Sequence, residues 1–463
     1  MIADHDTIVA PATAPGGALA VIRVSGDDAL KVCDRVFRGR TPLSDTPGHT
    51  LRYGRIADGE RIIDDVVAAV FRAPHSYTGE DSVEISCHGS SYIVSEILRL
   101  LLAAGARTAE PGEFTIRAYL AGRIDLSQAE AVADLIASSS RAAHAMASTQ
   151  MRGGYSQKLE SLRDKLLQLT SLLELELDFS EEEVEFADRG ELRETMQRIE
   201  AEIERLRSSF ALGNALKTGV AVAIVGAPNV GKSTLLNRLL NEERAMVSEI
   251  AGTTRDVIEE SIDIEGVRFR FLDTAGLRAT DDRLERMGIE RTLESLRRAR
   301  IILHLVDAAR VAEAGHCPDL VQTVREEFGE DFVPDGGQRI LKVVNKTDTA
   351  PAGFRLPEDA IGISAKRGEG IAELCRALRD TVDTGAVYHG DAVVSNSRHY
   401  EALTGARTAL RRALEGLDEG LPGDLLSEEI REVIRHLGSI TGRGAIAPDE
   451  VLEHIFSKFC IGK

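Results

Sequence analysis

Residues 226–233 read GAPNVGKS, which has the spacing GxxxxGKS, and they follow an apolar run of valine, alanine and isoleucine at 220–225. A strand, a glycine loop and a helix in this order bind phosphate, because backbone N–H groups and the helix N-terminus point at the anion. Lys232 is expected to reach the β- and γ-phosphates, and Ser233 is expected to ligate Mg²⁺. The segment therefore predicts a nucleoside triphosphate site.

Two further segments match the switch regions of a GTPase. Residues 252–256, GTTRD, are expected in a loop where one threonine hydroxyl completes the Mg²⁺ shell. Residues 273–276, DTAG, follow a predicted strand at 269–272. Asp273 can hold Mg²⁺ through water, and Gly276 can offer its N–H to the γ-phosphate.

The last two segments are typical of guanine recognition. Residues 345–348, NKTD, follow a predicted strand at 340–344, and residues 364–366, SAK, follow another at 361–363. The Asp348 carboxylate can accept from both N1–H and the 2-amino group of guanine, which selects GTP over ATP. The five segments together predict a GTP site made of Asn229, Val230, Gly231, Lys232, Ser233, Thr234, Ser248, Glu249, Ile250, Ala251, Gly252, Thr253, Thr254, Asp273, Thr274, Ala275, Gly276, Asn345, Lys346, Asp348, Ser364, Ala365 and Lys366.

Two positions bear on hydrolysis. Leu277 stands where a GTPase usually has the glutamine that orients the attacking water. Glu285 is a candidate for that role, and the alternative is an ordinary exposed helical glutamate. Asn229 places a neutral oxygen beside the phosphates, and the sequence offers no evident arginine finger. Because such a finger contributes about 10³–10⁵ in rate, a monovalent cation held by Asn229 and switch-loop carbonyls is a candidate substitute.

The surrounding sequence predicts three kinds of region. Residues 1–118 contain short β-branched runs and one helical pattern, so they are expected to be α/β. Leucine and isoleucine recur at helical spacing through 120–212 and again from 395 onward. Residues 217–382 alternate Val/Ile strands with helical stretches, which indicates a parallel α/β sheet.

Helical sequence on both sides of an α/β module favours an insertion. The predicted fold class is α/β plus α, with an inserted Ras-like P-loop GTPase domain. The expected boundaries are 1–118 for the N-terminal α/β domain, 119–216 and 383–463 for one discontinuous helical domain, and 217–382 for the GTPase domain.

Composition excludes several classes of protein. The formal net charge of −19 excludes a protein that coats nucleic acid by bulk charge, although a local basic patch or a partner that holds the nucleic acid remains open. The richest apolar run, 93–106, is interrupted by charges, so no membrane span is expected. The N-terminus lacks signal-peptide features. Five scattered cysteines without a CxxC pattern fit reduced thiols, and the expected location is cytoplasmic.

Segments outside the nucleotide motifs carry a family resemblance. They read DTIVA at 6–10, VIRVSG at 21–26, SYTGED at 76–81, PGEFT at 111–115, DLSQAEA at 125–131 and FCIGK at 459–463. Together with the mid-chain GTPase insertion, they resemble the bacterial and organellar tRNA modification GTPase family of the TrmE type, which acts on C5 of the wobble uridine. The resemblance covers essentially all 463 residues.

The resemblance implies a second site and a metal set. It implies that the N-terminal domain forms the homodimer and binds a tetrahydrofolate derivative through Arg23, Glu84, Arg123 and Lys463. A surface ion pair is the alternative for the two arginines. It also implies Mg²⁺ ligands at Ser233 and Thr254, and a water-orienting role for Glu285. The implied K⁺ ligands are Asn229, Ser248, Ile250 and Thr253.

Some positions leave alternatives open. Cys460 can be a buried structural cysteine or a functional thiol near the folate or RNA site, whereas its C-terminal context fits prenylation poorly. Cys87 and His88 are adjacent, but without further partners they are weak evidence for a metal pair. The chain departs from the family at residues 14–18, which carry no arginine, at Ser90 and at Arg123, where lysine is usual.

The function that these features imply is a homodimeric, K⁺-stimulated GTPase. With a flavin-dependent partner that supplies FAD and NADH chemistry, in a heterotetramer, it would attach an aminomethyl or carboxymethylaminomethyl group to uridine-34 of certain tRNAs. One rival is a ribosome-assembly GTPase, which shares the five nucleotide motifs. Another is a regulatory switch GTPase whose N-terminal domain is only a scaffold.

Overall fold

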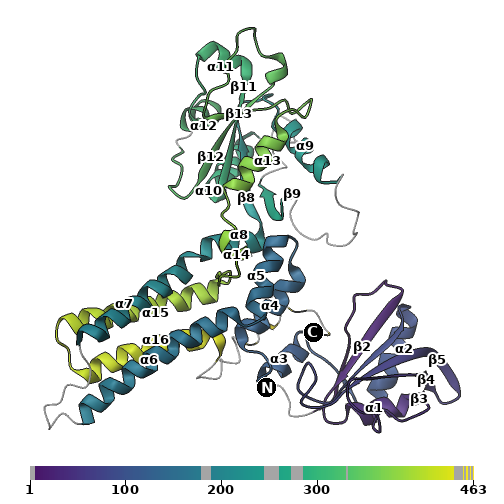
Figure 1. The fold of residues 1–463 in the computed structure, drawn as a ribbon. Helices are drawn as coiled ribbons and strands as arrows, with labels where there is room; N and C mark the ends of the chain where they lie inside the picture. Colours follow the sequence, from purple (N-terminus) through teal and green to yellow (C-terminus); the bar gives the residue numbers. More distant parts are fainter. Residues whose placement is uncertain are drawn as a thin grey trace. The chain divides into compact units, whose positions relative to one another are not determined.

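The computed structural model describes residues 6–178, 189–244, 260–272, 285–329 and 332–442, together with positions 452, 455, 456, 459 and 462. The chain divides into two compact units (Figure 1). The first comprises Met1–Ile136, Gln150–Glu200 and Ala402–Lys463, and the second comprises Ala137–Thr149 and Ala201–Glu401. The boundaries between the units fall within four helices, α4 (Leu126–Ala137), α5 (Arg141–Met151), α7 (Arg189–Ser208) and α15 (Ser397–Asp418).

A mixed seven-stranded sheet forms the N-terminal part of the first unit, in the order β3-β4-β5-β6-β2-β1-β7. All its neighbouring strands are antiparallel except β1 and β7. Helices α1 and α2 pack on it and share its apolar core. The elements are β1 (Ile8–Pro11), β2 (Leu19–Ser25), α1 (Ala29–Val36), β3 (Phe37–Gly39), β4 (Thr50–Asp58), β5 (Arg61–Phe71), β6 (Ser82–His88), α2 (Ser91–Ala103) and β7 (Arg107–Thr108).

Long helices complete the first unit. The leucine seam predicted for α6 is buried from Leu159 to Leu173, and α6 packs beside α16 (Figure 1). Between the parts of α7 and α15 that belong to this unit, Arg193 pairs with Asp418 at 2.8 Å. The helices that lie wholly or largely in this unit are α3 (Glu113–Leu120), α4 (Leu126–Ala137), α6 (Gly154–Asp178), α7 (Arg189–Ser208), α15 (Ser397–Asp418) and α16 (Gly423–Thr441), whereas α5 (Arg141–Met151) contributes only Gln150 and Met151.

The second unit is built on a six-stranded sheet in the order β13-β12-β11-β8-β10-β9. Its strands are parallel, as the sequence predicts, except that β9 runs antiparallel to β10. The reason is a two-residue turn in which Glu265 (φ 51°) and Gly266 (φ 85°) are both left-handed, the backbone of a tight hairpin. The strands are β8 (Val220–Val225), β9 (Glu260–Ile264), β10 (Val267–Phe271), β11 (Ile301–Asp307), β12 (Arg339–Asn345) and β13 (Ala360–Gly362).

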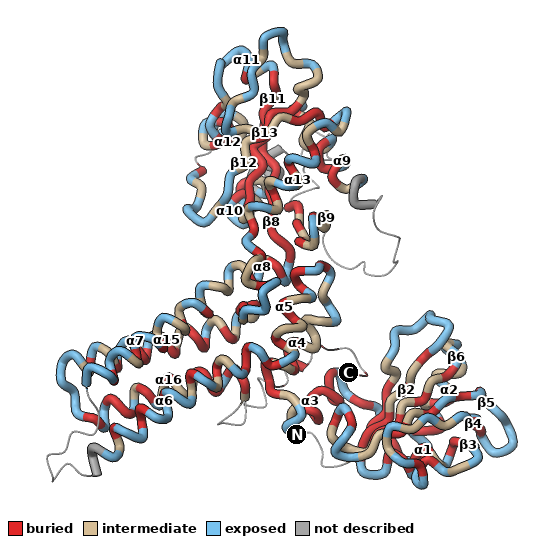
Figure 2. The backbone as a smooth tube through the Cα atoms, in the orientation of Figure 1, coloured by how far each residue is buried: buried red, intermediate tan, exposed pale blue. Residues whose placement is uncertain are grey.

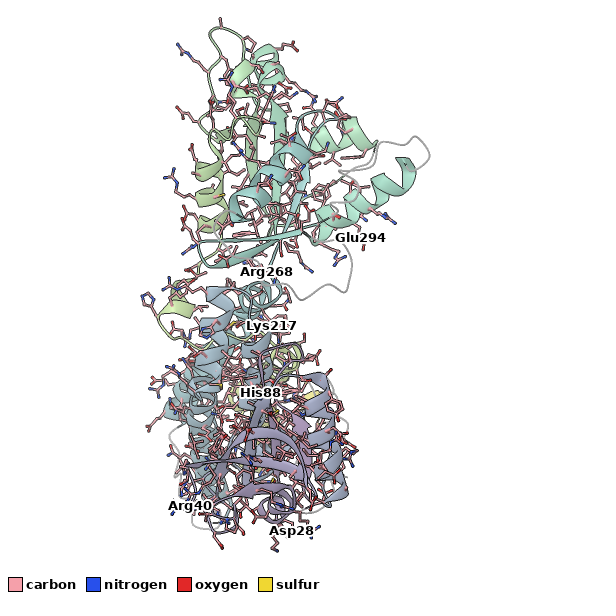
Figure 3. The ribbon with its side chains drawn as sticks, turned by 90° about the vertical axis from the view of Figure 1, so that its right-hand side faces the viewer. Asp28, Arg40, His88, Lys217, Arg268 and Glu294 are labelled. Carbon is pink, nitrogen blue, oxygen red and sulfur yellow. The ribbon has the colours of Figure 1, made fainter. Side chains whose placement is uncertain are left out.

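Apolar residues cover both faces of this sheet, as expected for a parallel sheet flanked by helices. Figure 2 shows buried residues in red along β8 and β11. Arg268, labelled in Figure 3, belongs to the hairpin and donates to Ser261 of β9 and to Ser139. The helices are α8 (Phe210–Thr218), α9 (Lys232–Arg244), α10 (Glu285–Arg298), α11 (Ala308–Ala314), α12 (Leu320–Phe328), the short 3₁₀ turn η2 (Thr347–Thr349), α13 (Ile371–Asp380) and α14 (Gly385–Tyr388).

In the part of the chain that the structure describes, no helix combines the length and apolar character required to cross a membrane. Over the same residues, His, Cys, Asp and Glu side chains form no group of three or more that could hold a metal ion.

Candidate functional site

The phosphate loop joins β8 to α9 and needs glycine at two places. A Cβ at Gly226 would lie 2.2 Å from the carbonyl oxygen of Leu305. A Cβ at Gly231 would lie 2.3 Å from Nδ2 of Asn345, and this glycine has a left-handed φ of 104°. Asn229 is also left-handed, with a φ of 58°, a conformation that asparagine tolerates better than most residues. The loop is therefore packed tightly against neighbouring strand ends.

The Lys232 side chain lies on its own loop. Its Nζ donates to the carbonyl oxygens of Gly226 at 2.7 Å and Ala227 at 3.0 Å. Burial lowers the pKa of Lys232, although Glu327 acts in the opposite direction. Among the described residues, the half-buried ammonium has carbonyl oxygens as its hydrogen-bond partners, and it is suited to exchange them for phosphate oxygens, which are charged acceptors.

Asn345, at the end of β12, links the phosphate loop to the base loop, defined as residues 364–370. Its Nδ2 donates to the carbonyl oxygen of Val230 at 2.8 Å, and its Oδ1 accepts from the N–H of Ala365 at 3.0 Å. The residue is only 3% exposed. Both hydrogen-bonding ends of one buried amide are therefore used to hold two expected nucleotide contacts in register.

The base loop is closed by its own hydrogen bonds. Ser364 donates its N–H to the carbonyl oxygen of Glu369 at 2.9 Å and accepts at its own carbonyl from the N–H of Gly368 at 2.7 Å. Asp348 faces this loop, and its Oδ2 lies 3.3 Å from Nε of Arg367. Lys346 instead pairs with Asp307, at 2.7 Å from Nζ to Oδ2.

A cavity of about 200 Å³ adjoins the phosphate loop at the end of β11. Its walls include Asn229 and Lys346, which are both expected nucleotide contacts, together with Arg310 and Thr323. The cavity therefore borders the predicted nucleotide site.

The structure brings together the phosphate-loop and base-loop residues that the sequence predicts: Asn229, Val230, Gly231, Lys232, Ser233, Thr234, Asn345, Lys346, Asp348, Ser364, Ala365 and Lys366. Their role as GTP contacts stays a prediction. The predicted contacts at 248–254 and 273–276 lie outside the described residues, and so do Cys460 and Lys463. Glu285 is the first residue of α10, and only its backbone is described.

A second polar site lies on the seven-stranded sheet, at the predicted folate positions. Arg23 of β2 faces Glu84 of β6 in register, and Nη2 lies 2.8 Å from Oε1. The Arg23 guanidinium also lies 5.2 Å from the ring centroid of Tyr77 and 5.6 Å from that of Phe114. Two aromatic rings and one carboxylate thus fix its orientation.

Two loop residues that sequence reasoning missed connect the predicted folate positions. Tyr77 contacts Arg23, and two residues later Gly79 lies so close to Arg123 that a Cβ would be 3.6 Å from its Cγ. The C-terminal segment also reaches this region, because a Cβ at Gly462 would lie 1.9 Å from the carbonyl oxygen of Pro11. The motif SYTGED at 76–81 contributes only to the family resemblance, and no spacing rule predicts these contacts.

Cys87 and His88 do not face one another. They are consecutive in β6, where side chains alternate between faces, and Cys87 is buried while His88, which is labelled in Figure 3, is exposed. His88 pairs with Asp64, at 2.7 Å from Nδ1 to Oδ1. Burial raises the pKa of the Cys87 thiol to about 11 and also raises that of Cys33. Both behave as core residues, not as reactive thiols.

A glycine loop between a buried parallel strand and a helix, tied through Asn345 to the end of a neighbouring strand, defines a P-loop nucleotide-binding protein of the GTPase class. Two family models match most of the chain. Residues 7–123 match the model described as GTP-binding protein TrmE N-terminus, and residues 126–460 match the MnmE helical domain.

Relatives match the chain over nearly all of its length. The chain is 49% identical over 482 residues to the tRNA modification GTPase MnmE of Christiangramia forsetii, which covers 99% of both chains. It is 49% identical over 470 residues to the protein of the same name from Bacteroides fragilis, covering 99% of this chain and all of the other. The chain belongs to the MnmE family of tRNA modification GTPases.

A solved structure of Era from Aquifex aeolicus, bound to GDP and AlF₄⁻, matches at 28% identity. It covers 41% of this chain and 65% of that one, with a TM-score of 0.26.

Proposed function

We propose that this MnmE family member is a K⁺-stimulated GTPase that acts with a flavin-dependent partner. Together they install an aminomethyl or carboxymethylaminomethyl group at C5 of uridine-34 in certain tRNAs. The observation that carries this proposal is the near-complete match, at 49% identity, to proteins named tRNA modification GTPase. The buried Asn345 bridge between the phosphate and base loops supports a working GTP site in this chain.

The decisive experiment is mass spectrometry of nucleosides from total tRNA, with and without the gene for this protein. Loss of the C5-aminomethyl-type wobble uridines is the expected result. An unchanged nucleoside profile would contradict the proposal and favour the ribosome-assembly alternative, which cosedimentation with ribosomal subunits would then test.

Within the GTPase domain, proposed at 217–382, Ser233 and Thr254 would ligate Mg²⁺, and Glu285 would orient the attacking water. Glu285 begins α10, which also carries the exposed Glu294. We expect Glu285→Gln to cut GTP turnover strongly while leaving GTP affinity nearly unchanged. Glu294→Gln is the control on the same helix. Equal GTP turnover in Glu285→Gln and Glu294→Gln would indicate that Glu285 is an ordinary exposed glutamate with no role in hydrolysis.

The proposed K⁺ site comprises Asn229, Ser248, Ile250 and Thr253. GTP turnover is expected to be much faster in KCl than in NaCl at equal ionic strength. Since Asn229 has a φ of 58°, Asn229→Gly removes the amide oxygen while keeping a backbone that glycine adopts freely. The variant should lose the difference between the two salts. A retained difference would exclude Asn229 as a K⁺ ligand.

A tetrahydrofolate derivative is the proposed ligand of the site formed by Arg23, Glu84, Arg123 and Lys463. Arginine and lysine suit the carboxylates of a folate, and Glu84 suits the N–H groups of its pterin ring. Equilibrium dialysis with 5-formyltetrahydrofolate tests this assignment. Glu84→Gln should weaken binding, whereas Glu60→Gln on the exposed turn after β4 should not. Absence of binding by the unaltered protein would favour the alternative in which the N-terminal domain is only a scaffold.

The proposed assembly is a homodimer, formed through residues 1–118, that joins the flavin-dependent partner in a heterotetramer. The helical domain would comprise 119–216 and 383–463. A formal net charge of −19 makes strong electrostatic attraction to tRNA unfavourable for the isolated chain. We therefore expect weak tRNA binding alone and tighter binding with the partner. Tight tRNA binding in the absence of the flavin-dependent partner would contradict this part of the proposal.

A further inference from the structure

The ion pair between Arg367 and Asp348 lies at the carboxylate that is expected to recognise guanine. The Asp348 side chain is only 8% exposed, and its Oδ2 lies 3.3 Å from Nε of Arg367. Arg367 follows directly on the residues 364–366 that were predicted to brace the base. None of the five nucleotide motifs includes it.

The backbone of Arg367 is held in place from two sides. Its N–H donates to Oγ of Ser364 at 3.2 Å, within the closed base loop. Its carbonyl oxygen accepts from Nη2 of Arg238 at 2.9 Å. Arg238 comes from α9, the helix that begins at the phosphate loop. The direction in which the Arg367 side chain leaves the loop is thus set by a residue of the phosphate-binding element.

Gly368 makes room for the Arg238 contact. A Cβ at this position would lie 2.0 Å from Nη2 and 2.7 Å from Cζ of Arg238, and Gly368 is left-handed, with a φ of 82°. The Arg238 guanidinium therefore lies directly against the loop backbone. Together the contacts run from α9 through the Arg367 backbone to the Arg367 side chain and the Asp348 carboxylate.

We propose that Arg238 and Arg367 are positioning residues that orient the Asp348 carboxylate toward the two N–H donors of guanine. This inference rests on the proposed role of Asp348 as the guanine-reading residue. Recognition of both N1–H and the 2-amino group requires the two carboxylate oxygens to lie in the plane of the base. A guanidinium beside one oxygen restricts rotation of the carboxylate, so Arg367 favours guanine over hypoxanthine, which lacks the 2-amino group.

The test compares the affinities of the full chain for GDP and IDP by titration calorimetry. The unaltered protein should prefer GDP. Arg367→Ala should reduce that preference by about threefold to fivefold at low salt, which is the upper part of the range measured for exposed ion pairs, because Asp348 is largely buried. Arg367→Lys should retain part of the preference, because an ammonium can still pair with the carboxylate. The exposed Arg376→Ala on α13 is the matched control and should not change it.

A double-mutant cycle tests the proposed relay, in which Arg238 acts on the Asp348 carboxylate through Arg367. Arg238→Ala should reduce the GDP preference less than Arg367→Ala, and the double variant should behave like Arg367→Ala alone, because Arg238 acts through Arg367. In an Asp348→Asn background, whose binding is measured with xanthosine diphosphate, Arg367→Ala should have no effect, since no carboxylate is left to pair. Melting temperatures of the single variants should stay near that of the unaltered protein.

Two results would overturn the relay. One is an unchanged ratio of GDP to IDP affinity in Arg367→Ala, whether or not both affinities fall, and the other is additive effects of Arg238→Ala and Arg367→Ala on that ratio. A different result, no GDP preference in the unaltered protein, would instead refute the role of Asp348 on which the inference rests. The two failures are therefore distinguishable.

Discussion

Asn345 donates its side-chain amide to the carbonyl oxygen of Val230 at 2.8 Å, although the two residues are 115 positions apart in the chain. The same amide accepts from the N–H of Ala365 at 3.0 Å. One buried side chain thus connects the phosphate loop, the end of β12 and the base loop. The site is held by this cross-link as well as by the sheet.

Asn345→Ala should break both connections. The Val230 carbonyl and the Ala365 N–H would lose their partner inside the protein, at a cost of about 1–3 kcal/mol for each group left unsatisfied. We expect at least tenfold weaker GDP binding by calorimetry and a lower melting temperature. Asn214→Ala, at an exposed asparagine on α8, is the control and should change neither. Full GDP affinity in Asn345→Ala would show that the bridge is dispensable.

Gly231→Ala should displace the side-chain amide of Asn345 while leaving its hydrogen-bonding groups in place. Its Cβ would lie 2.3 Å from Nδ2 of Asn345, and the left-handed φ of 104° adds backbone strain, which is on the order of 1–3 kcal/mol. Gly315→Ala, where φ is 74° and no atom lies within 4 Å of a Cβ, bears strain without the clash. GDP affinity should fall only for Gly231→Ala. An equal loss of GDP affinity in Gly231→Ala and Gly315→Ala would show that backbone strain, and not the clash with Asn345, causes the loss.

His304 should make the second unit less stable in acid. It is fully buried in β11, and its Nε2 lies 2.9 Å from Oγ1 of Thr323, which itself donates to the carbonyl oxygen of Asp319. Burial lowers the pKa of His304 to about 4. As pH falls below about 6.5, the imidazole of His304 is therefore protonated in the unfolded chain but stays neutral in the folded protein. This difference lowers the free energy of unfolding.

The loss of stability should amount to about 2 kcal/mol between pH 7.5 and pH 5. Urea unfolding, followed by hydrogen exchange of peptides from β11, measures it. His304→Phe should remove this part of the pH dependence, whereas His316→Phe at an exposed position should keep it. Identical pH profiles for His304→Phe and the unaltered protein would contradict the prediction.

Sequence patterns predicted the nucleotide-binding part of the fold well, for a physical reason. The strand predicted at 220–225 is β8, residue for residue, because a strand covered on both faces is apolar along its whole length. By contrast, β4 was missed. Its residues Leu51, Tyr53 and Arg55 are exposed, and arginines interrupt its pattern, so one face of the strand carries no burial signal.

The helical seams were predicted less accurately where small residues are buried. On α15, Leu403 and Leu410 are buried as expected, but Leu414 and Leu417 are only half-buried. Ala406, Ala409 and Ala413 are buried on that helix instead, because alanine lets neighbouring helices approach closely. Sequence reasoning that follows the large apolar side chains overlooks this arrangement.

The site residues that were missed are those joined only by the tertiary fold. Tyr77 reaches Arg23 through a ring-face contact, and Arg367 reaches Asp348 across two loops. Neither contact follows from a spacing along the chain. Motifs predict which backbone segments bind a ligand, whereas the side chains that orient those segments come from unrelated positions.

The buried charge cluster around Arg117 provides the last prediction. Arg117 is 5% exposed and pairs with Glu113, which is 2% exposed, with 3.0 Å between Nη2 and Oε1. It also pairs with Asp6 at 2.6 Å and Glu80 at 3.1 Å. Burial opposes ionisation of Glu113, but hydrogen bonds from Arg107, the Glu110 N–H and Arg117 outweigh it, so the pKa of Glu113 lies below its usual value.

Arg117→Leu should destabilise the first unit by about 3 kcal/mol, because Glu113 and Glu80 lose a buried cationic partner, while Arg107 still pairs with Glu113. Arg99→Leu is the matched control, since Arg99 is exposed and also pairs with two carboxylates, so its loss should change the stability much less than the loss of Arg117. The lowered pKa of Glu113 stabilises the folded protein fully only above the pKa of the carboxyl in the unfolded chain, which is near 4.5. The difference in the free energy of unfolding between Arg117→Leu and the unaltered protein should therefore shrink as pH falls below that value. Urea unfolding at pH 7 and pH 4, followed by hydrogen exchange of peptides from α3, measures both effects. Similar losses for Arg117→Leu and Arg99→Leu at pH 7 would mean that water already reaches the cluster and compensates its charges.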